Sequence, residues 1–525
     1  MAKIELYDTT LRDGAQSEGI SFSVSDKLKV CEKLDELGIQ FIEGGWPGAN
    51  PKDVSFFKAA KKLRLKNAHL VAFGSTRHAN STAGRDKVLK GLVSADTKYI
   101  TIFGKSWDLH VRDVFKVELS ENLRMIEDSI RFLRSKGKTV FYDAEHFFDG
   151  YRSNKDYALK TLKAAENAGA SRIILCDTNG GAMTSSVFEI IEEVRAVIKT
   201  PLGMHAHNDC EMAVANSIAA IQAGCVQIHG TMNGYGERCG NANLISIIAN
   251  LKLKLGMDCI SDMELRELVE VARFVAEICN LKLEDNQPFV GNSAFAHKAG
   301  VHVNAILKNP KTYEHVDPHA IGNHRRLLIS ELSGKSMIAK KARDMDLDIG
   351  KNGEKSGKIL KALQDMENKG YHFESAEASL ELLMKRVMKK FKDFFDLENF
   401  RVIIEKNKDG KMASEATIKL KVGKEIEHTA SLGDGPVNAL DSALRKALKK
   451  FYPNIAQMHL IDYKVRVLDE KAGTAARVRV LIQSQDKMDS WWTMGVSENI
   501  IDASWQALVD SVEYKLLKDA ERSGL

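Results

Sequence analysis

Short apolar runs alternate with helix-like segments eight times in the first half of the chain. Continuous apolar runs of four to eight residues are typical of buried strands, and apolar residues at a 3.6-residue period between them are typical of helices. Repeated strand–helix units place parallel strands in one sheet covered by helices. The expected strands cover residues 4–10, 40–45, 69–74, 99–103, 139–145, 172–178, 201–207 and 226–230.

Two folds accommodate this alternation: a closed (β/α)8 barrel, the TIM barrel, and an open doubly wound sheet. We expect the α/β barrel because the strands number eight and no Gly-rich dinucleotide turn follows the first one. Active sites of such barrels lie at the C-terminal ends of the strands. Polar residues collect at these predicted ends: Arg12, Asp13, Glu43, Glu145, Asp177, Thr178, His205, His207 and the segment 233–243.

The seventh predicted strand ends in His205-Ala206-His207. Side chains two residues apart on a strand point to the same face, so the two imidazoles lie side by side. Because histidine is the commonest metal ligand of proteins, the pair is half of a metal site. The alternative is two hydrogen-bonded histidines in the core.

Charge and cysteine content narrow the class of protein. The net charge is +5, from 76 basic and 71 acidic residues, which gives no argument for a nucleic acid or membrane partner. Seven cysteines without CxxC spacing favour a reduced, cytoplasmic protein. We expect no signal peptide, because the first residues run straight into a strand, and no membrane span, because no 18-residue apolar run occurs.

The second half of the chain has a different pattern. We expect a barrel domain over residues 1–280, a helical linker region over 281–395 and a C-terminal α+β domain over 396–525. In the last of these, three strands and a helix occur twice, which indicates an internal duplication of βββα units. Both helices begin in turn-rich segments whose free N–H groups could hold a carboxylate. The strands are expected at 400–405, 416–422, 426–431, 460–467, 476–482 and 491–496, and the helices at 437–451 and 500–517.

Three motifs carry a family resemblance: D-T-T-L-R-D-G-A-Q-S-E-G at 8–19, H-A-H-N-D at 205–209 and G-Y-G-E-R-C-G-N-A-N-L at 234–244. In this order they resemble the metal-dependent barrel acyltransferases and lyases, which include isopropylmalate and homocitrate synthases and hydroxymethylglutaryl-CoA lyase. The resemblance implies one divalent ion per barrel, Mg, Mn or Zn, acting as a Lewis acid on a 2-oxo acid. Its implied ligands are Asp13, His205, His207 and Asn241.

The alternatives for two of these ligands are a helix cap for Asp13 and an ordinary loop amide for Asn241. The resemblance also implies that Arg12 stabilises the oxyanion that forms on the ketone. The alternative for Arg12 is an ion pair with Glu43, and both roles are compatible. Thr178 is expected to contact the substrate carboxylate or to cap its strand, and Gln16 is a weaker candidate for the same pocket.

Beyond the barrel, F-A-H-K-A-G-V-H at 295–302 and the later Tyr313-Glu314 resemble the linker of the synthases. In the synthases, a His and a Tyr of this linker reach the active site of a neighbouring subunit. The matching residues are His302 and Tyr313, which implies a homodimer or a higher oligomer. Glu145 and His302 are both candidates for the base that takes the acetyl-CoA methyl proton, with Glu145 slightly favoured, and Tyr313 could donate to the thioester oxygen.

Within the family, the segments 42–53, 175–181 and 491–508 most resemble the branch that condenses acetyl-CoA with pyruvate to citramalate and CoA in isoleucine biosynthesis. This is an acyltransferase that converts the acyl group into an alkyl group on transfer. The runner-up substrate is 2-oxoisovalerate, used in leucine biosynthesis. The segment 433–439 resembles an amino-acid-binding regulatory domain, with isoleucine as the expected effector, and its alternative is dimerisation without a ligand.

Two other classes of protein share features with this sequence. Metal hydrolases of the amidohydrolase kind also use an HxH motif, but on the first strand rather than the seventh. A non-catalytic amino-acid sensor built on an inactive barrel is disfavoured, because the polar set Arg12, Asp13, Glu145, His205, His207 and Asn241 is complete.

Overall fold

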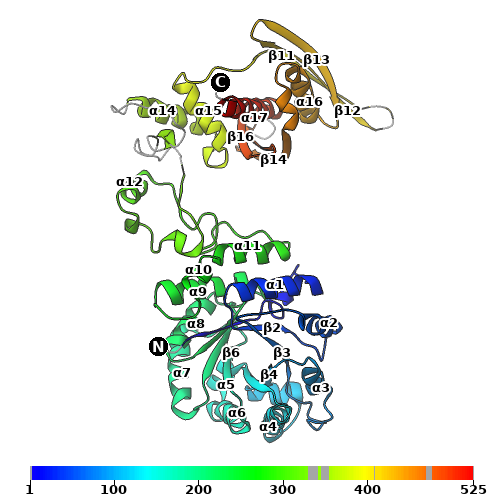
Figure 1. The fold of residues 1–525 in the computed structure, drawn as a ribbon, viewed down its shortest axis with the longest axis vertical. Coiled ribbons are helices and arrows are strands. Elements are labelled where there is room, and N and C mark those ends of the chain that lie inside the picture. Colours follow the sequence, from blue (N-terminus) through cyan, green and yellow to red (C-terminus); the bar gives the residue numbers. More distant parts are fainter. Residues whose placement is uncertain are drawn as a thin grey trace. The chain divides into compact units, whose positions relative to one another are not determined.

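The structure is a computed structural model that describes residues 3–328, 338, 341–343, 354–406, 408, 410–468 and 476–523. The chain forms two compact units. The first comprises residues 1–295 and 315–325, and the second comprises residues 296–314 and 326–525 (Figure 1). The predicted domain limits at 280 and 395 stay predictions.

The first unit is a closed barrel of eight parallel strands in the order β1 to β8, so the predicted TIM barrel is confirmed and the open sheet is excluded. Pairing of β1 with β8, in the register Tyr7 opposite His229, closes the sheet. The strands are β1 Glu5–Asp8, β2 Phe41–Gly45, β3 His69–Ser75, β4 Tyr99–Lys105, β5 Thr139–Glu145, β6 Arg172–Asp177, β7 Leu202–Ala206 and β8 Gln227–Gly230.

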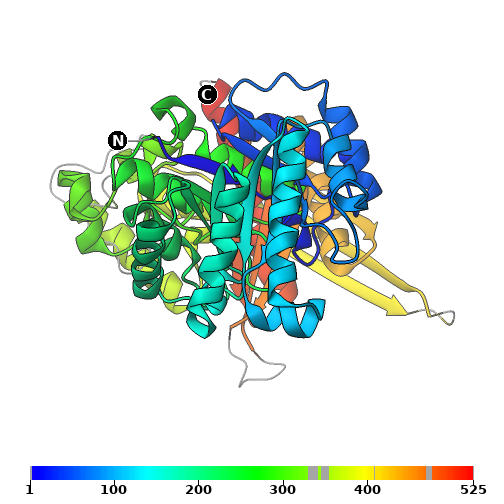
Figure 2. The ribbon, with the colours of Figure 1, turned by 90° about the horizontal axis from the view of Figure 1, so that it is seen from below.

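The helices between the strands lie outside the barrel (Figures 1 and 2). They bury Val, Leu and Ile side chains against the strands in one continuous core, which fixes the strand ends that carry the polar residues. The helices are α1 Val24–Glu36, α2 Pro51–Ala60, α3 Lys87–Ser94, α4 Leu119–Ser135, α5 Phe147–Ser153, α6 Lys155–Ala168, α7 Thr184–Val197, α8 Ala213–Gln222, α9 Leu244–Leu253, α10 Asp262–Leu265 and α11 Leu268–Ile278.

The start of α1 differs slightly from what its sequence suggests. The pair Ser25-Asp26 has the composition of a helix cap, but the cap is Ser23, whose side chain accepts a hydrogen bond from the Asp26 N–H. The Asp26 carboxylate in turn accepts from the Ser23 N–H at 2.9 Å. This reciprocal capping box satisfies two free donors at once, and a cap at Ser25 would lose it.

The second unit begins with the linker segment. Strand β9 Ala296–His297 pairs with β10 Arg326–Leu327, and α12 Gly300–Lys308, α14 Glu354–Asn368 and α15 Glu377–Val387 supply helices. Of the helical pattern expected between 339 and 395, residues 339–340 and 344–353 lie outside the described residues.

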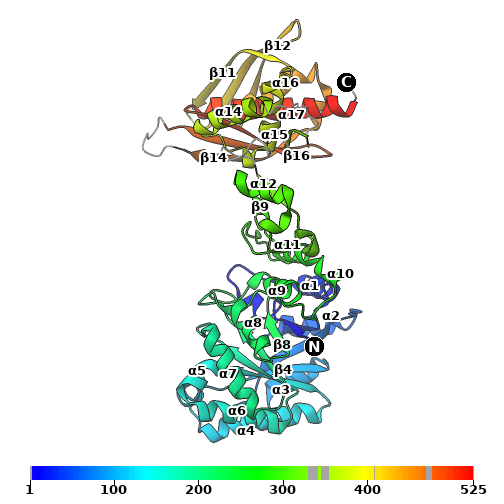
Figure 3. The same ribbon diagram turned by 90° about the vertical axis from the view of Figure 1, so that its left-hand side faces the viewer.

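The C-terminal domain contains the predicted pair of βββα units, each with an antiparallel three-stranded sheet (Figure 3). The first is β11 Asp396–Lys406, β12 Met412–Val422, β13 Glu425–Gly433 and α16 Pro436–Lys449. The second is β14 His459–Val467, β15 Val478–Gln485, β16 Ser490–Ser497 and α17 Ile500–Ser523. The two units share one apolar core. Over the described ranges of the whole chain, no helix has the length and apolar character needed to cross a membrane.

Candidate active site

A cavity of about 250 Å³ opens at the C-terminal ends of the barrel strands. Seven of the residues expected at the site line it: Arg12, Asp13, Gln16, Glu145, Thr178, His205 and His207. The cavity wall also contains Trp46, Phe73, Phe103, Asp143, Cys176, Glu237 and Arg238.

Four polar side chains converge on one side of this cavity. His205 Nε2 lies 3.4 Å from His207 Nε2, 3.3 Å from Asn241 Nδ2 and 3.6 Å from Asp13 Oδ2. Asn241 Nδ2 lies 3.5 Å from Asp13 Oδ2. All four residues are buried. The loop after β8 brings Asn241 there by a backbone bridge to His207, and Gly236 makes room for it, because a Cβ at Gly236 would lie 2.0 Å from Asn241 Oδ1.

The donor set fits a divalent ion in its spacing. Metal–ligand bonds of about 2.1 Å hold neighbouring ligand atoms about 3.0–3.4 Å apart, close to the distances in this cluster. Asn241 Oδ1 is buried without a hydrogen bond, and because the two ends of an amide are assigned rather than observed, a flip turns this oxygen to the cluster. Among the described residues, no group made of His, Cys, Asp and Glu alone has the arrangement of a metal site, and the candidate cluster here includes the Asn241 amide.

Protonation favours cation binding at this cluster. Burial lowers the pKa of His205 to about 3 and also lowers the pKa of His207, so both imidazoles are neutral at neutral pH. Burial opposes the charge on Asp13, but the neighbouring Arg12 guanidinium outweighs it and lowers the pKa of Asp13. Neutral imidazoles and an ionised carboxylate are the forms that bind metals.

Arg12 is held on three sides. Its guanidinium forms ion pairs with Asp13 and with the buried Glu43, and it lies 3.8 Å from the centre of the Phe73 ring. Glu43 also accepts a hydrogen bond of 2.6 Å from Tyr7 Oη. The suggested Arg12–Glu43 ion pair therefore exists and fixes a guanidinium that lines the cavity.

Glu145 and Thr178 stand at the ends of β5 and β6. Glu145 forms an ion pair with Lys105, and its carboxylate lines the cavity. Thr178 Oγ1 accepts a hydrogen bond of 2.9 Å from the His146 N–H and keeps its own proton free to donate.

The linker residues His302 and Tyr313 belong to the second compact unit. His302 and Tyr313 stack with ring centres 4.1 Å apart, and Tyr313 is 44% exposed. Within one chain, His302 and Tyr313 therefore lie side by side.

The aromatic wall of the cavity is what sequence reasoning missed. Trp46 follows β2, and Phe73 and Phe103 each lie two residues before the end of β3 and β4. Their ring centres lie 5.5–5.9 Å apart. The strand-end rule that found the polar residues also covers these positions. It did not single them out, because an aromatic residue at a strand end looks the same as a core residue.

Comparison with known proteins covers all three segments of the chain. Residues 3–275 match the HMGL-like family, residues 289–370 the homocitrate synthase post-HMGL domain-like family and residues 374–516 the LeuA allosteric (dimerisation) domain. An (R)-citramalate synthase of Geobacter sulfurreducens is 57% identical over 100% of this chain and 99% of its own length. The chain belongs to the (R)-citramalate synthase family.

Two further relatives place the chain within that family. An (R)-citramalate synthase of Aquifex aeolicus is 54% identical over 99% of both chains. A 2-isopropylmalate synthase of Methanocaldococcus jannaschii is 29% identical over 98% of this chain and 95% of its own length, a much greater distance. The prediction of an acyltransferase of the citramalate synthase branch is confirmed.

Proposed function

We propose that the chain condenses acetyl-CoA with pyruvate and hydrolyses the resulting thioester, which releases citramalate and CoA. The observation that carries this proposal is the small cavity that joins Arg12, Glu145 and the His205–Asn241 cluster behind an aromatic wall. Family membership supports the same reaction. The seven unpaired cysteines support the cytoplasm as its location.

Asp13, His205, His207 and Asn241 would hold the divalent ion, which when bound supplies Lewis acidity to the 2-oxo acid. Arg12 faces the same space, so its guanidinium stabilises the negative charge that develops on the ketone oxygen. Gln16 and Thr178 line the cavity, and the free Thr178 hydroxyl proton suits a hydrogen bond to the substrate carboxylate.

Glu145 is the favoured base for the acetyl-CoA methyl proton, because its carboxylate lines the cavity in which the ketone is held. His302 and Tyr313 complete the proposal as contributions from a neighbouring copy, in which His302 assists the base and Tyr313 donates to the thioester oxygen. The dimerisation domain over residues 374–516 supports a homodimer.

The aromatic wall favours pyruvate over 2-oxoisovalerate. Trp46, Phe73 and Phe103 pack on one another, which limits the space that they can yield to a larger substrate. The methyl of pyruvate fills little space, whereas the isopropyl group of 2-oxoisovalerate adds two carbons. Overpacking a rigid wall costs about 1–3 kcal/mol, which corresponds to roughly 5- to 150-fold in selectivity.

A panel of 2-oxo acids tests the substrate. Release of CoA, followed with a thiol reagent, is expected to depend on a 2-oxo acid, with kcat/KM for pyruvate at least about 10-fold above that for 2-oxoisovalerate. Phe103→Ala, which opens the wall, is expected to narrow this ratio. Phe141→Ala removes the same side chain from the layer of Tyr7 and Phe41 inside the barrel and is the matched control. A wild-type preference for 2-oxoisovalerate would overturn the choice of pyruvate.

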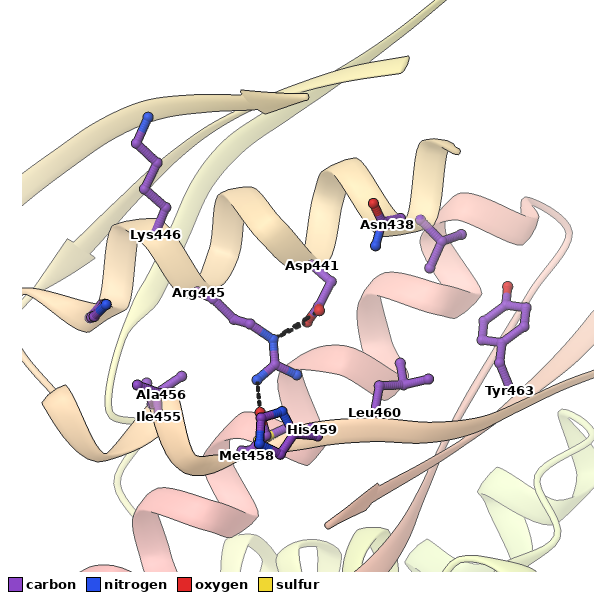
Figure 4. A pocket seen from close by; sticks show the side chains of 12 residues that line it. Asn438, Asp441, Arg445, Lys446, Ile455, Ala456, Met458, His459, Leu460 and Tyr463 are labelled. Atoms are coloured by element: carbon purple, nitrogen blue, oxygen red, sulfur yellow. Dashed lines mark hydrogen bonds and ion pairs between the residues drawn. The ribbon is translucent and has the colours of Figure 1, made fainter. Parts of the chain in front are cut away.

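A second cavity, of about 700 Å³, lies between α16 and β14 in the C-terminal domain (Figure 4). Arg445 Nε donates to both Asp441 oxygens at 2.8 Å, and Arg445 Nη1 donates to the Met458 carbonyl at 2.8 Å. Arg445 Nη2 is buried and has no hydrogen bond. Val437, Leu460 and Ile455 add apolar lining.

We propose that this cavity binds the amino-acid effector, with isoleucine favoured. A zwitterion needs a cation for its carboxylate and an anion for its ammonium group, and Arg445 and Asp441 supply both side by side. The unused Nη2 donor of Arg445 is available to the effector carboxylate. The apolar lining suits a branched side chain.

Arg445→Gln is expected to raise the isoleucine concentration for half-inhibition by about 10- to 100-fold, the usual weight of a charged hydrogen bond. Inhibition of CoA release is titrated with isoleucine and leucine in parallel. Lys450→Gln is the control, because Lys450 follows the end of α16 and pairs with Glu425 and Glu427 rather than lining the cavity. If neither amino acid inhibits the wild type, the domain serves dimerisation alone.

A further inference from the structure

One cation at the barrel mouth has no part in the reaction described so far. Lys105 ends β4 and stands opposite Glu145 in the register of the parallel pair β4–β5. The two side chains form an ion pair. Two residues earlier on the same strands, Phe103 and Asp143 stand opposite each other and line the cavity, so Lys105 and Glu145 are one layer further toward its opening.

The surroundings of Lys105 are largely apolar. Its ammonium lies 5.6 Å from the Phe103 ring centre and 5.8 Å from the Phe115 ring centre, and its side chain is 12% exposed. Within the described part of the chain, Glu145 is the acidic group with which Lys105 forms an ion pair. Because the Lys105 ammonium is largely shielded from water, it interacts more strongly with neighbouring charges than it would in bulk water.

We propose that Lys105 is a catalytic residue that stabilises the enolate oxygen of acetyl-CoA while Glu145 accepts the methyl proton. The inference rests on the proposed function. In the step, the C–H bond of the acetyl methyl breaks and its proton moves to a Glu145 oxygen. The electron pair of that bond forms the C=C bond of the enolate, while the π pair of the thioester C=O bond moves onto its oxygen, which becomes negative.

The charge balance of this step singles out Lys105. Before proton transfer, the ammonium charge is matched by the Glu145 carboxylate. After the transfer Glu145 is neutral, so Lys105 loses its partner at the moment when the thioester oxygen, bonded to the carbon beside the reacting methyl, gains a negative charge. The Lys105–Glu145 ion pair is thus replaced by an ion pair between Lys105 and the enolate oxygen, and neither charge is left unpaired. A cation already in place where negative charge develops stabilises the transition state.

Arg12 and Arg238 line the cavity, but both are paired with other groups. Arg12 is bound by Asp13 and Glu43 on the side of the ketone. Arg238 donates to both oxygens of Asp209 at 2.7 and 2.9 Å and to the Thr178 carbonyl at 2.8 Å. Lys105, in contrast, is paired with the proposed base, Glu145. In this proposal Arg12 stabilises the negative charge on the ketone oxygen, and Lys105 stabilises the negative charge on the enolate oxygen.

Binding of carboxymethyl-CoA tests this inference independently of turnover. This analogue carries a planar carboxylate on the carbon that takes the place of the acetyl methyl, so it puts a negative oxygen next to the position of the enolate oxygen. Glu145→Gln imitates the protonated base and leaves Lys105 without its carboxylate. It is therefore expected to bind the analogue at least about 10-fold more tightly than the double variant Glu145→Gln/Lys105→Met, measured by calorimetry on the full chain. Free CoA should bind both variants equally.

Equal affinity of the two variants for carboxymethyl-CoA would overturn the role of Lys105, whichever 2-oxo acid the wild type uses. A lysine that only orients Glu145 gives that result too, because Glu145 is already replaced in both proteins. Lys33→Met in the Glu145→Gln background is the matched control, since Lys33 is similarly covered but pairs with Glu270 and Glu36. If the methionine variant does not fold, Lys105→Gln takes its place with the same two outcomes.

Discussion

Replacing Arg12 with alanine is expected to lower kcat for pyruvate-dependent CoA release by about 100- to 1,000-fold, the usual effect of removing one oxyanion donor. The guanidinium is fixed by Glu43, by Asp13 and by the Phe73 ring, so it is preorganised before the charge appears. The KM for acetyl-CoA should change much less than kcat, because Arg12 acts on the ketone. Steady-state kinetics with a thiol reagent measure both.

The matched control for this prediction is Arg172→Ala. Arg172, like Arg12, is paired with a glutamate: it donates from Nε and Nη2 to Glu5 at 3.0 and 2.8 Å. Unlike Arg12, it begins a strand, β6, rather than following a strand end. Its loss should leave kcat unchanged within a few-fold. Arg12→Lys retains a positive charge for the buried Glu43 and checks that lost activity is not lost folding. Full activity of Arg12→Ala would remove Arg12 from the chemistry.

Replacing His207 with alanine is expected to weaken binding of a divalent ion by at least about 100-fold and to abolish CoA release. Loss of one of four donors leaves an incomplete coordination shell, and even outer partners of metal ligands are worth about 10- to 100-fold in affinity. Equilibrium dialysis with Mn²⁺, free of substrate, measures the affinity directly. Wild-type protein should bind one ion per chain.

His69→Ala is the control for the metal prediction, because His69 begins β3 while the candidate ligands follow strand ends. It should bind one ion as the wild type does. A wild type that binds no divalent ion, or a His207→Ala variant that binds as tightly as the wild type, would contradict the assignment of the cluster as a metal site.

The sequence by itself determined the fold class and the polar half of the site. The alternation indicated parallel strands under helices, and the count of eight strands without a Gly-rich dinucleotide turn favoured the closed barrel over the open sheet. A barrel places Arg12, Asp13, Glu145 and the histidines at one rim. The repeated βββα pattern was equally readable, because strand and helix periods are local properties of the chain.

Tertiary structure alone decided how those residues meet. Strand register set Lys105 opposite Glu145, and the fold of the loop after β8 set Asn241 against His205. The aromatic wall of Trp46, Phe73 and Phe103 also appeared only in three dimensions. Sequence periodicity indicates which face of a strand a side chain occupies. A cavity depends instead on which side chains of different strands lie at the same level along the barrel axis. The closure and stagger of the whole barrel fix that level.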